Sequence, residues 1–258
     1  MKKIFLVCRE DLREESFCLP WEQQAEPSAA EVIVVIGGDG TMLHAIQRYR
    51  DFNLPFIGLH KGGPSSIGFI MNEFNQQNLE ELDSDKIQFI ESRFLAADLS
   101  SDGQSIKTVY AFNDVNFERT GTQALKVDVS VNDETYFAPI QCDGILVASA
   151  TGSTAYNANA GGAILPVDSN NLILTAIAPQ RCFGWNTSAL SENETVSLKL
   201  VESDKRPARF VADGVNQGMN FTKADIYSSP KTVRIGFAEN SNFRKKVMDL
   251  QFRGRIGR

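Results

Sequence analysis

Continuous apolar runs alternate with a helix-like stretch in the first third of the chain. The runs at 4–8, 32–36 and 56–59 are rich in branched aliphatic residues, and the stretch 42–49 places its apolar side chains on one helical face. Continuous apolar runs are typical of parallel strands covered on both faces. Apolar residues spaced three or four positions apart, as in the stretch 42–49, are typical of an amphipathic helix. This alternation predicts a doubly wound parallel α/β domain over residues 1–90.

From about residue 87 the pattern changes to short runs broken by turn residues such as Asp102-Gly103 and Asn132-Asp133. It predicts a second, antiparallel β-rich sandwich domain over residues 91–238. The apolar spacing of 241–250, with Ser241 as N-cap, predicts a helix in a final segment, 239–258, that packs back on the first domain. The runs expected as strands are 87–99, 108–118, 125–131, 136–148, 172–177, 196–201, 208–212 and 233–237.

Three glycines and one carboxylate stand where the second apolar strand meets the predicted helix: Gly37-Gly38-Asp39-Gly40-Thr41. Glycines let backbone N–H groups approach a phosphate closely, and a helix start adds its positive dipole end. A carboxylate beside a phosphate is costly unless it binds a metal or accepts a proton. An alternative stays open, in which Asp39 caps the N–H of Met42 or Leu43. Thr41 either caps the helix or binds a phosphate oxygen.

A second candidate is a run of small hydroxyl residues that follows an apolar strand: Thr151-Gly152-Ser153-Thr154-Ala155-Tyr156. Hydroxyl groups offer many short hydrogen-bond donors, and Tyr156 offers a flat face on which a base can stack. The alternative is an ordinary helix start at Ser153 or Thr154, with Tyr156 in the core. Asn113-Asp114 and Asp213-Gly214 also follow strands, and each pair suits either a ribose diol or a simple turn.

Charge, cysteine content and length narrow the class of protein. The chain has 258 residues and a net charge of −6, from 26 Lys and Arg against 32 Asp and Glu, which disfavours nucleic acid as a partner. No apolar run approaches the ~18 residues that a membrane span needs. The N-terminal apolar stretch is too short for a signal peptide, and the cysteines form no CxxC pair. We therefore expect a cytoplasmic protein without a membrane partner and without a metal held by protein ligands alone.

Taken together and in this order, the glycine turn, Asn113-Asp114, Asp143-Gly144 and the hydroxyl run followed by Gly161-Gly162 resemble the NAD kinase family. The likeness spans nearly the whole chain. It implies an N-terminal α/β domain, a C-terminal β-rich domain and a final segment returning to the first. It also implies an enzyme that phosphorylates NAD with ATP or polyphosphate and Mg²⁺, or another divalent metal, to give NADP, and that forms a homodimer or homotetramer.

The resemblance implies a role for each matching residue. Asp39 would accept the proton of the adenosine ribose 2′-hydroxyl, and the rest of the glycine turn would cradle the transferred phosphoryl group. Asn113 and Asp114 would hold a ribose or the diphosphate, and Asp143 would hold the nicotinamide amide, across a subunit boundary. Thr154, Ala155 and Tyr156 would contact the adenine side. The remaining candidate residues for NAD or phosphate are His44, Phe69, Thr151, Ser153, Asn157, Asn159 and Asp213.

Several positions depart from the family pattern or admit another interpretation. Asp114 stands where the family usually has Glu, which shortens the carboxylate by one methylene, and 149–150 and 157–160 also differ. The loop around 61–66 is longer than expected. His44 fits a helix surface as well as a phosphate contact, and Arg244-Lys245-Lys246 is typical of solvated charges at a helix end. The competing functions are an NAD- or NADP-binding sensor without activity and, from the glycine turn alone, a lipid or small-alcohol kinase.

Overall fold

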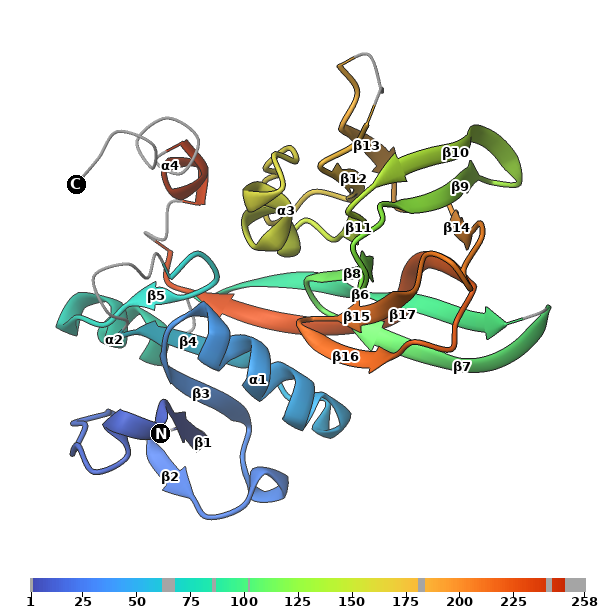
Figure 1. Cartoon of the computed structure of the whole chain (residues 1–258). Helices are drawn as coiled ribbons and strands as arrows, with labels where there is room; N and C mark the ends of the chain where they lie inside the picture. The colour runs from blue at the N-terminus through green and yellow to red at the C-terminus, as the bar shows by residue number, and fades with distance from the viewer. Residues whose placement is uncertain are drawn as a thin grey trace. The chain divides into compact units, whose positions relative to one another are not determined.

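The computed structural model describes residues 2–61, 68–84, 87–101, 103–180, 184–239 and 243–248 (Figure 1). The chain divides into two compact units, one comprising Met1–Ser92 with Thr232–Arg258 and the other Arg93–Lys231. Of the positions named above, 62–66, Asp102, Ser241 and most of the segment 239–258 lie outside the described residues. In the part of the chain that is described, no helix is long and apolar enough to cross a membrane.

The first unit is built on a parallel sheet in the order β2-β1-β3-β4-β17, with β5 also paired to β4. Each apolar run of the first ninety residues forms one strand, because a buried strand satisfies its backbone groups through its two neighbours. The bounds are β1 (Lys3–Cys8), β2 (Glu22–Gln24), β3 (Val32–Gly37), β4 (Phe56–His60), β5 (Asn72–Glu73) and β17 (Lys223–Phe237).

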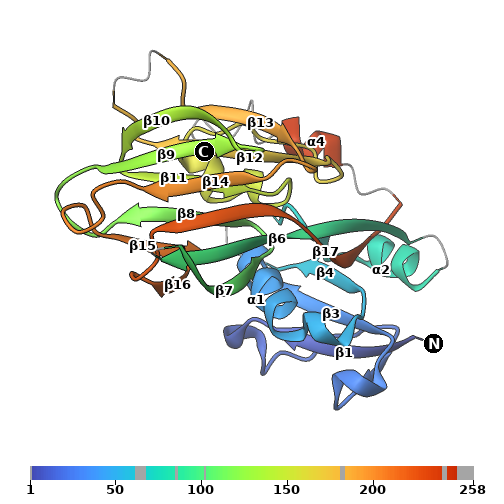
Figure 2. The same ribbon diagram turned by 90° about the vertical axis from the view of Figure 1, so that its right-hand side faces the viewer.

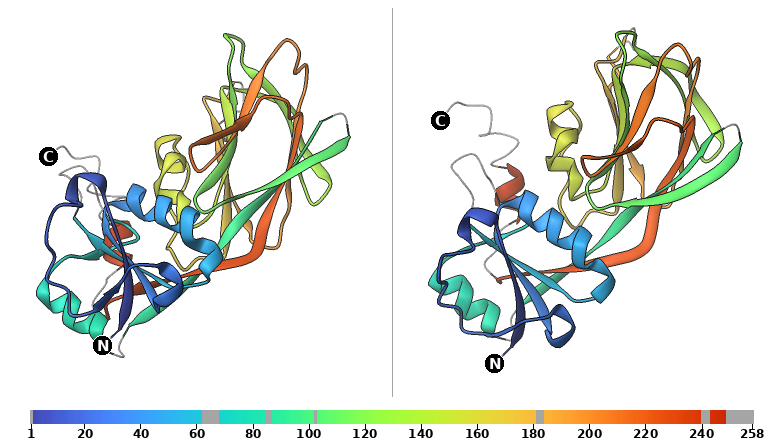
Figure 3. Two further views of the ribbon diagram at one scale, coloured as in Figure 1. Left: turned by 90° about the horizontal axis from the view of Figure 1, so that it is seen from below. Right: turned by 60° about the horizontal axis from the view of Figure 1, so that its bottom comes forward.

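Helices cover both faces of this sheet. Alternate residues of β3, beginning with Val32, pack in one core with Leu79 and Leu82 of α2 (Gln76–Asp83). The helix α1 (Asp39–Tyr49), whose buried residues include Ile46, lies on the other face (Figure 3). The doubly wound prediction is confirmed. The short helix α4 (Phe243–Met248) and three single turns complete the unit: η1 (Glu10–Leu12), η2 (Pro27–Ala29) and η3 (Arg50–Phe52).

The second unit is an antiparallel β-sandwich (Figure 2). One sheet has the order β13-β12-β11-β8-β15-β16, and the other has β10-β9-β14-β17 with β6 and β7. Their inward side chains form a single core. The bounds are β6 (Gln88–Ser101), β7 (Gln104–Ala111), β8 (Asp114–Arg119), β9 (Leu125–Val131), β10 (Glu134–Cys142), β11 (Gly144–Ala148), β12 (Asn171–Ile177), β13 (Thr187–Ser191), β14 (Val196–Leu200), β15 (Ala208–Ala212) and β16 (Val215–Gly218), with η4 (Gly152–Thr154) and α3 (Tyr156–Asn159) as its helical turns.

Several strand limits differ from the expected runs. The run 108–118 is divided between β7 and β8, and 136–148 is divided between β10 and β11 at Asp143. The run 233–237 is the end of the long strand β17, and its residue Ile235 pairs with Phe56 in the parallel sheet of the first unit. An apolar run shows that a segment is buried in a sheet, but its strand partner depends on residues far away in the sequence.

Candidate functional site

Asp39 is the first residue of α1, and one residue, the N-cap Gly38, separates it from the end of β3. Its carboxylate accepts two backbone hydrogen bonds, from the N–H of Phe69 to Oδ2 (2.9 Å) and from the N–H of Ile70 to Oδ1 (3.0 Å). The N–H of Met42 instead donates to the carbonyl of Gly38 (3.1 Å). The alternative in which Asp39 caps its own helix is therefore wrong. The carboxylate holds a distant loop.

The glycines of this turn serve two purposes. A Cβ at Gly37 would lie 2.6 Å from Oγ1 of Thr41, so a side chain there would displace Thr41. Gly40 is exposed, and a Cβ there would meet nothing within 4 Å. Gly37 is thus required by packing, whereas Gly40 leaves the helix start open to a ligand. An open helix start with uncovered N–H groups is a suitable place for a phosphate.

The loop that Asp39 holds is a tight turn formed by residues 68–71, here called the 68–71 turn. Gly68 has φ +64° and accepts a hydrogen bond from the N–H of Met71 (3.2 Å). A Cβ at Gly68 would lie 2.5 Å from Cγ of His60, so the imidazole packs directly against the turn. Only glycine adopts this backbone conformation without strain and also leaves room for the ring.

Lys246 of α4 contacts the same turn. Its Nζ donates to the carbonyl oxygen of Gly68 (2.9 Å) and to that of Met71. Burial lowers the pKa of Lys246, and the nearby carboxylates of Asp39 and Glu73 oppose that shift. The interpretation of Lys246 as a solvated helix-end charge is wrong. A charge run in the sequence cannot show which of its members the tertiary structure covers.

His60, at the end of β4, completes this cluster. Its pKa is lowered mainly by burial; Asp39 acts in the opposite direction, and Lys246 adds to the lowering. Carboxylate, imidazole and ammonium thus gather at the carboxyl ends of β3 and β4, the edge where parallel sheets place their ligands. His44, in contrast, is exposed on α1, as the helix-surface interpretation expects.

In the second unit, Asp213 organises the backbone around Asn113 and Asp114. It lies in the left-handed region (φ +48°) in the turn between β15 and β16. Its carboxylate accepts hydrogen bonds from the N–H groups of Phe112 (2.7 Å), Asn113 (2.7 Å) and Asp114 (3.2 Å). Asp213 therefore fixes the course of this segment.

Ser149 and the hydroxyl run hold the same segment from the other side. Oγ of Ser149 donates to the carbonyl of Phe112 (2.6 Å), and Oγ1 of Thr151 does so at 3.1 Å. A Cβ at Gly152 would lie 2.0 Å from the carbonyl oxygen of Asn113, so no side chain fits there. The three motifs of this unit are therefore interlocked, although they are separated by long stretches of sequence.

The hydroxyl run divides into inward and outward side chains. Ser153 donates to the carbonyl of Ala150 (2.7 Å), and Asn157 is fully buried, with Nδ2 on the carbonyls of Ser153 (3.0 Å) and Ala163 (2.8 Å). Oδ1 of Asn157 accepts from Thr175 (2.7 Å). In contrast, Tyr156 is 38% exposed, so the alternative that places it in the core is wrong. Thr154 and Ala155 are half-buried, and Asn159 is exposed.

Asp114 has an unusual electrostatic setting. It is 5% exposed, and its pKa is raised to about 7 by burial first and then by the neighbouring carboxylates of Asp213 and Glu118. Glu118 lies on the same face of β8 and pairs with Arg209 (2.7 Å). A carboxyl group with a pKa near neutrality can donate or accept a hydrogen bond under physiological conditions.

Within the second unit, Asp143 lies apart from Asp114. It precedes β11, whose Gly144 pairs with Glu118, whereas Asp114 pairs with Ala148 at the other end of the strand. Four residues of strand separate the two ends by roughly 13 Å. The Asp143 carboxylate pairs with Arg119 through both oxygens (2.8 and 3.1 Å). The resemblance implies that Asp143 meets the nicotinamide across a subunit boundary, and within its own unit it lies apart from Asp114.

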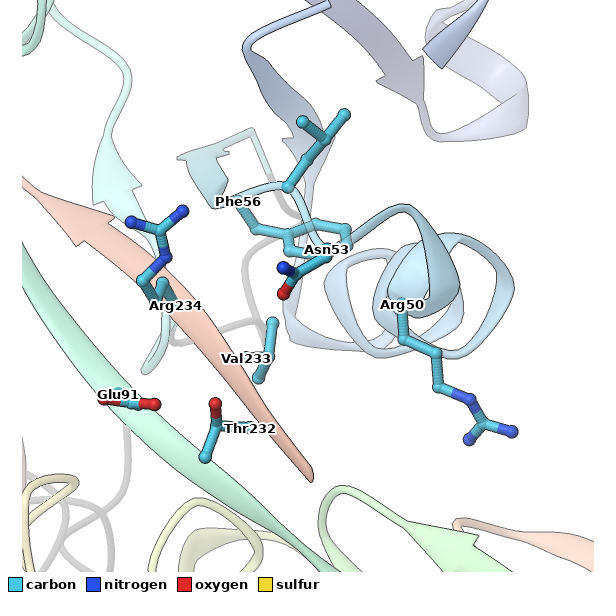
Figure 4. A pocket seen from close by; sticks show the side chains of 8 residues that line it. Arg50, Asn53, Phe56, Glu91, Thr232, Val233 and Arg234 are labelled. Carbon is cyan, nitrogen blue, oxygen red and sulfur yellow. The ribbon is translucent and has the colours of Figure 1, made fainter. Parts of the chain in front are cut away.

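Two hollows in the structure contain none of the predicted site residues. One, of about 150 Å³, lies at the amino end of β4, and Figure 4 shows the side chains of Arg50 and Arg234 at its border pointing away from each other. The other, of about 400 Å³, is apolar and is lined by Phe137 and Trp185 of the sandwich. Among the described residues, no group of three or more His, Cys, Asp or Glu side chains is arranged to hold a metal ion.

Comparisons with known proteins agree with the fold. Yeast NADH kinase complexed with NADH superimposes with a TM-score of 0.77 at 18% identity, covering 100% of this chain and 90% of that one. The NAD kinase from Archaeoglobus fulgidus in complex with ATP superimposes with a TM-score of 0.70 at 24% identity, covering 95% of this chain and 98% of that one. The architecture is thus the one found in kinases of nicotinamide dinucleotides.

Comparisons of sequence identify the family, whereas the comparisons of structure identify only the fold. The family described as ATP-NAD kinase C-terminal domain matches residues 113–234. The NAD kinase of Rickettsia felis is 36% identical over 227 residues, which is 87% of each chain. The NAD kinase of Brucella suis is 34% identical over 226 residues, 87% of this chain and 86% of that protein. The chain belongs to the NAD kinase family.

Proposed function

We propose that this protein is an NAD kinase, which transfers the γ-phosphoryl group of ATP to the adenosine ribose 2′-hydroxyl of NAD and so produces NADP. The names of its relatives support this function. The observation that carries it is the place of Asp39, a half-buried carboxylate on an open glycine turn, with each oxygen oriented by one backbone N–H. Such a group is suited to removing a proton from a hydroxyl beside a phosphate.

The chemistry follows from the hydrogen bonds of Asp39. Each carboxylate oxygen accepts one backbone N–H and retains a second lone pair. One of these takes the proton of the ribose 2′-hydroxyl while the hydroxyl oxygen forms its bond to the γ-phosphorus. The bond between that phosphorus and the bridging oxygen breaks, and ADP departs with the electron pair. The protein mainly supplies position and charge stabilisation, as phosphoryl transfer requires.

Gly38, Gly40 and the start of α1 would present backbone N–H groups to the transferred phosphoryl group, with Gly37 and Thr41 packed together to shape the turn. Mg²⁺ or another divalent ion, entering with the nucleotide, would offset the phosphate charge. Polyphosphate offers the same chain of phosphates as an alternative donor.

In the second unit, the side chains of Asn113 and Asp114 would hold the ribose or diphosphate, and Tyr156 with Thr154 and Ala155 would contact the adenine side. Asp213, Thr151, Ser153 and Asn157 would act by positioning this segment, since their side chains are engaged with the protein itself. Asp143 would reach the nicotinamide across a subunit boundary in a dimer or tetramer, because its own unit places it at the far end of β11.

The direct test is to incubate the purified protein with NAD and Mg²⁺, and with ATP or polyphosphate, and to detect NADP with an NADP-specific dehydrogenase. Asp39→Asn should keep NAD binding and lose on the order of 10²- to 10⁴-fold in kcat, the usual contribution of a general base. Asp51→Asn is the matched control, because Asp51 is an exposed acidic residue of the same unit. NAD binding without turnover from any donor would instead indicate a sensor.

A further inference from the structure

The 68–71 turn is held from two sides by side chains of opposite charge. The Asp39 carboxylate accepts the N–H groups of Phe69 and Ile70. The Lys246 ammonium donates to the carbonyls of Gly68 and Met71. All four residues of the turn therefore contribute one backbone group to a charged side chain. The Asp39 carboxylate and the Lys246 ammonium are thus connected through the four backbone groups of this turn.

The residue after the turn is anchored by the same C-terminal part of the chain. Asn72 is buried and donates through Nδ2 to the carbonyls of Gly58 (3.0 Å) and Gly236 (3.1 Å). Its Oδ1 accepts the N–H of Ala238 (2.8 Å). The end of β17 thus fixes one side of the turn, and α4 brings Lys246 to its carbonyls.

A lysine in this place requires an explanation, because burying an ammonium group is costly unless hydrogen bonds and opposite charge compensate. Both are present, since two backbone carbonyls accept from Nζ and the carboxylates of Asp39 and Glu73 lie close enough to favour its charged form. An apolar residue would avoid the cost of burial but would leave these two carbonyls without Nζ. The structure therefore favours a lysine that shapes the turn.

We infer that Lys246 is a positioning residue for Asp39: it fixes the 68–71 turn, whose N–H groups orient the carboxylate that takes the ribose proton. This role rests on the proposed function, but the clamp itself is a property of the protein alone. Through this clamp, the helix α4 would contribute to the orientation of the Asp39 carboxylate. Lys246 acts through the turn, since its ammonium is directed at backbone carbonyls.

The first experiment measures the turn without any substrate. In Lys246→Met, hydrogen exchange of the Phe69 and Ile70 amides should accelerate by about tenfold or more, as expected when a local opening becomes easier. Lys3→Met is the matched control, because Lys3 is an exposed lysine on β1 of the same unit, and its variant should exchange like the wild type. Unchanged exchange in Lys246→Met would overturn the clamp, whether or not the protein proves to be an NAD kinase.

The second experiment measures the kinase reaction. Lys246→Met should lower kcat on the order of 10- to 100-fold, because an ångström of misplacement costs about that much. The KM values for NAD and ATP should stay within about twofold. In an Asp39→Asn background the same change should cost less than about twofold, since the group being positioned is gone.

A direct contact between Lys246 and the phosphates predicts a different result. Its loss would then raise the KM for ATP and would cost the same factor with Asp39 present or replaced, and either finding would refute the positioning role. Lys246→Gln, which retains an N–H donor, provides a second variant if Lys246→Met does not fold. It should show the same split between kcat and KM with a smaller loss. A wild type that forms no NADP would refute the proposed function and leave the exchange test intact.

Discussion

In each unit the carboxylate of an aspartate, Asp39 or Asp213, accepts hydrogen bonds from backbone N–H groups far away in the sequence. The two aspartates differ in their surroundings. Asp39 accepts two N–H groups at the start of a helix, beside Gly40, where an added Cβ would meet nothing within 4 Å. Asp213 accepts three N–H groups within a network that Ser149 and Thr151 complete from the other side. The same hydrogen-bonding chemistry therefore leaves a half-buried carboxylate at a helix start in one unit and builds a closed network in the other.

Under the proposed function, each unit would offer a ligand a different kind of polar group. In the first unit these would be backbone N–H groups at a helix start, so glycines are the informative residues. In the second unit, side chains provide it, and most of the hydroxyl and amide groups are used inside the protein. A motif rich in polar residues is consequently a poor guide to which of them meet a ligand.

The strongest test of this comparison removes the Asp213 carboxylate. Asp213→Ala should lower the free energy of unfolding by about 4 kcal/mol, because three backbone N–H groups lose a charged acceptor. Asp168→Ala, an exposed acidic position of the same unit, should change it by less than about 0.5 kcal/mol. Denaturant titration measures both. A loss as small as that of the control would contradict the framework role.

The pH dependence of stability sharpens the electrostatic contrast. Because the folded protein raises the pKa of Asp114 to about 7 from 3.8, it binds more protons than the unfolded chain between these values. Stability should therefore fall as pH rises through this window, by about 2 kcal/mol from pH 5 to pH 7 for this residue. Asp114→Asn should remove that slope. Equal slopes for wild type and variant in urea titrations would show that Asp114 is ionised in the folded protein.

The smallest expected effect concerns the exposed ring of Tyr156. Tyr156→Ala should raise the KM for NAD by about tenfold, as the loss of one base-stacking face would, whereas Tyr156→Phe should not. Tyr136→Ala is the control, since Tyr136 is an exposed tyrosine on β10 of the same unit. Steady-state kinetics at varied NAD concentration measures the KM of each variant. An unaltered KM in Tyr156→Ala would remove Tyr156 from the adenine side.

Much of the fold could be predicted from the local pattern of the sequence, because the spacing of apolar residues shows which side of a helix or strand is buried. The run 125–131 coincides with β9, and the stretch 42–49 lies within α1. The short strands β13 and β16 were not expected. All of their residues are half-buried or exposed, and neither strand has the apolar run of a buried strand. Such edges are defined by pairing with a neighbour, which a local pattern does not show.

The residues of the candidate site also fall into two groups: those that the local sequence reveals, and those whose importance only the tertiary contacts reveal. Asp39, Asn113 and Asp114 stand out in the sequence, since glycines and paired polar residues at strand ends are visible locally. Lys246 and Asn72 do not, because their importance comes from contacts with residues more than 160 positions away.

The sequence by itself indicated the family, the fold class and a set of candidate residues, because motifs and apolar spacing are local properties that the chain carries in any conformation. The tertiary structure decided which polar groups remain available and which hold the fold together. It directs Asp39 to the 68–71 turn, Asp213 to three backbone N–H groups and Lys246 to two carbonyls. A hydrogen bond depends on distance and direction, and these exist only once remote segments have come together.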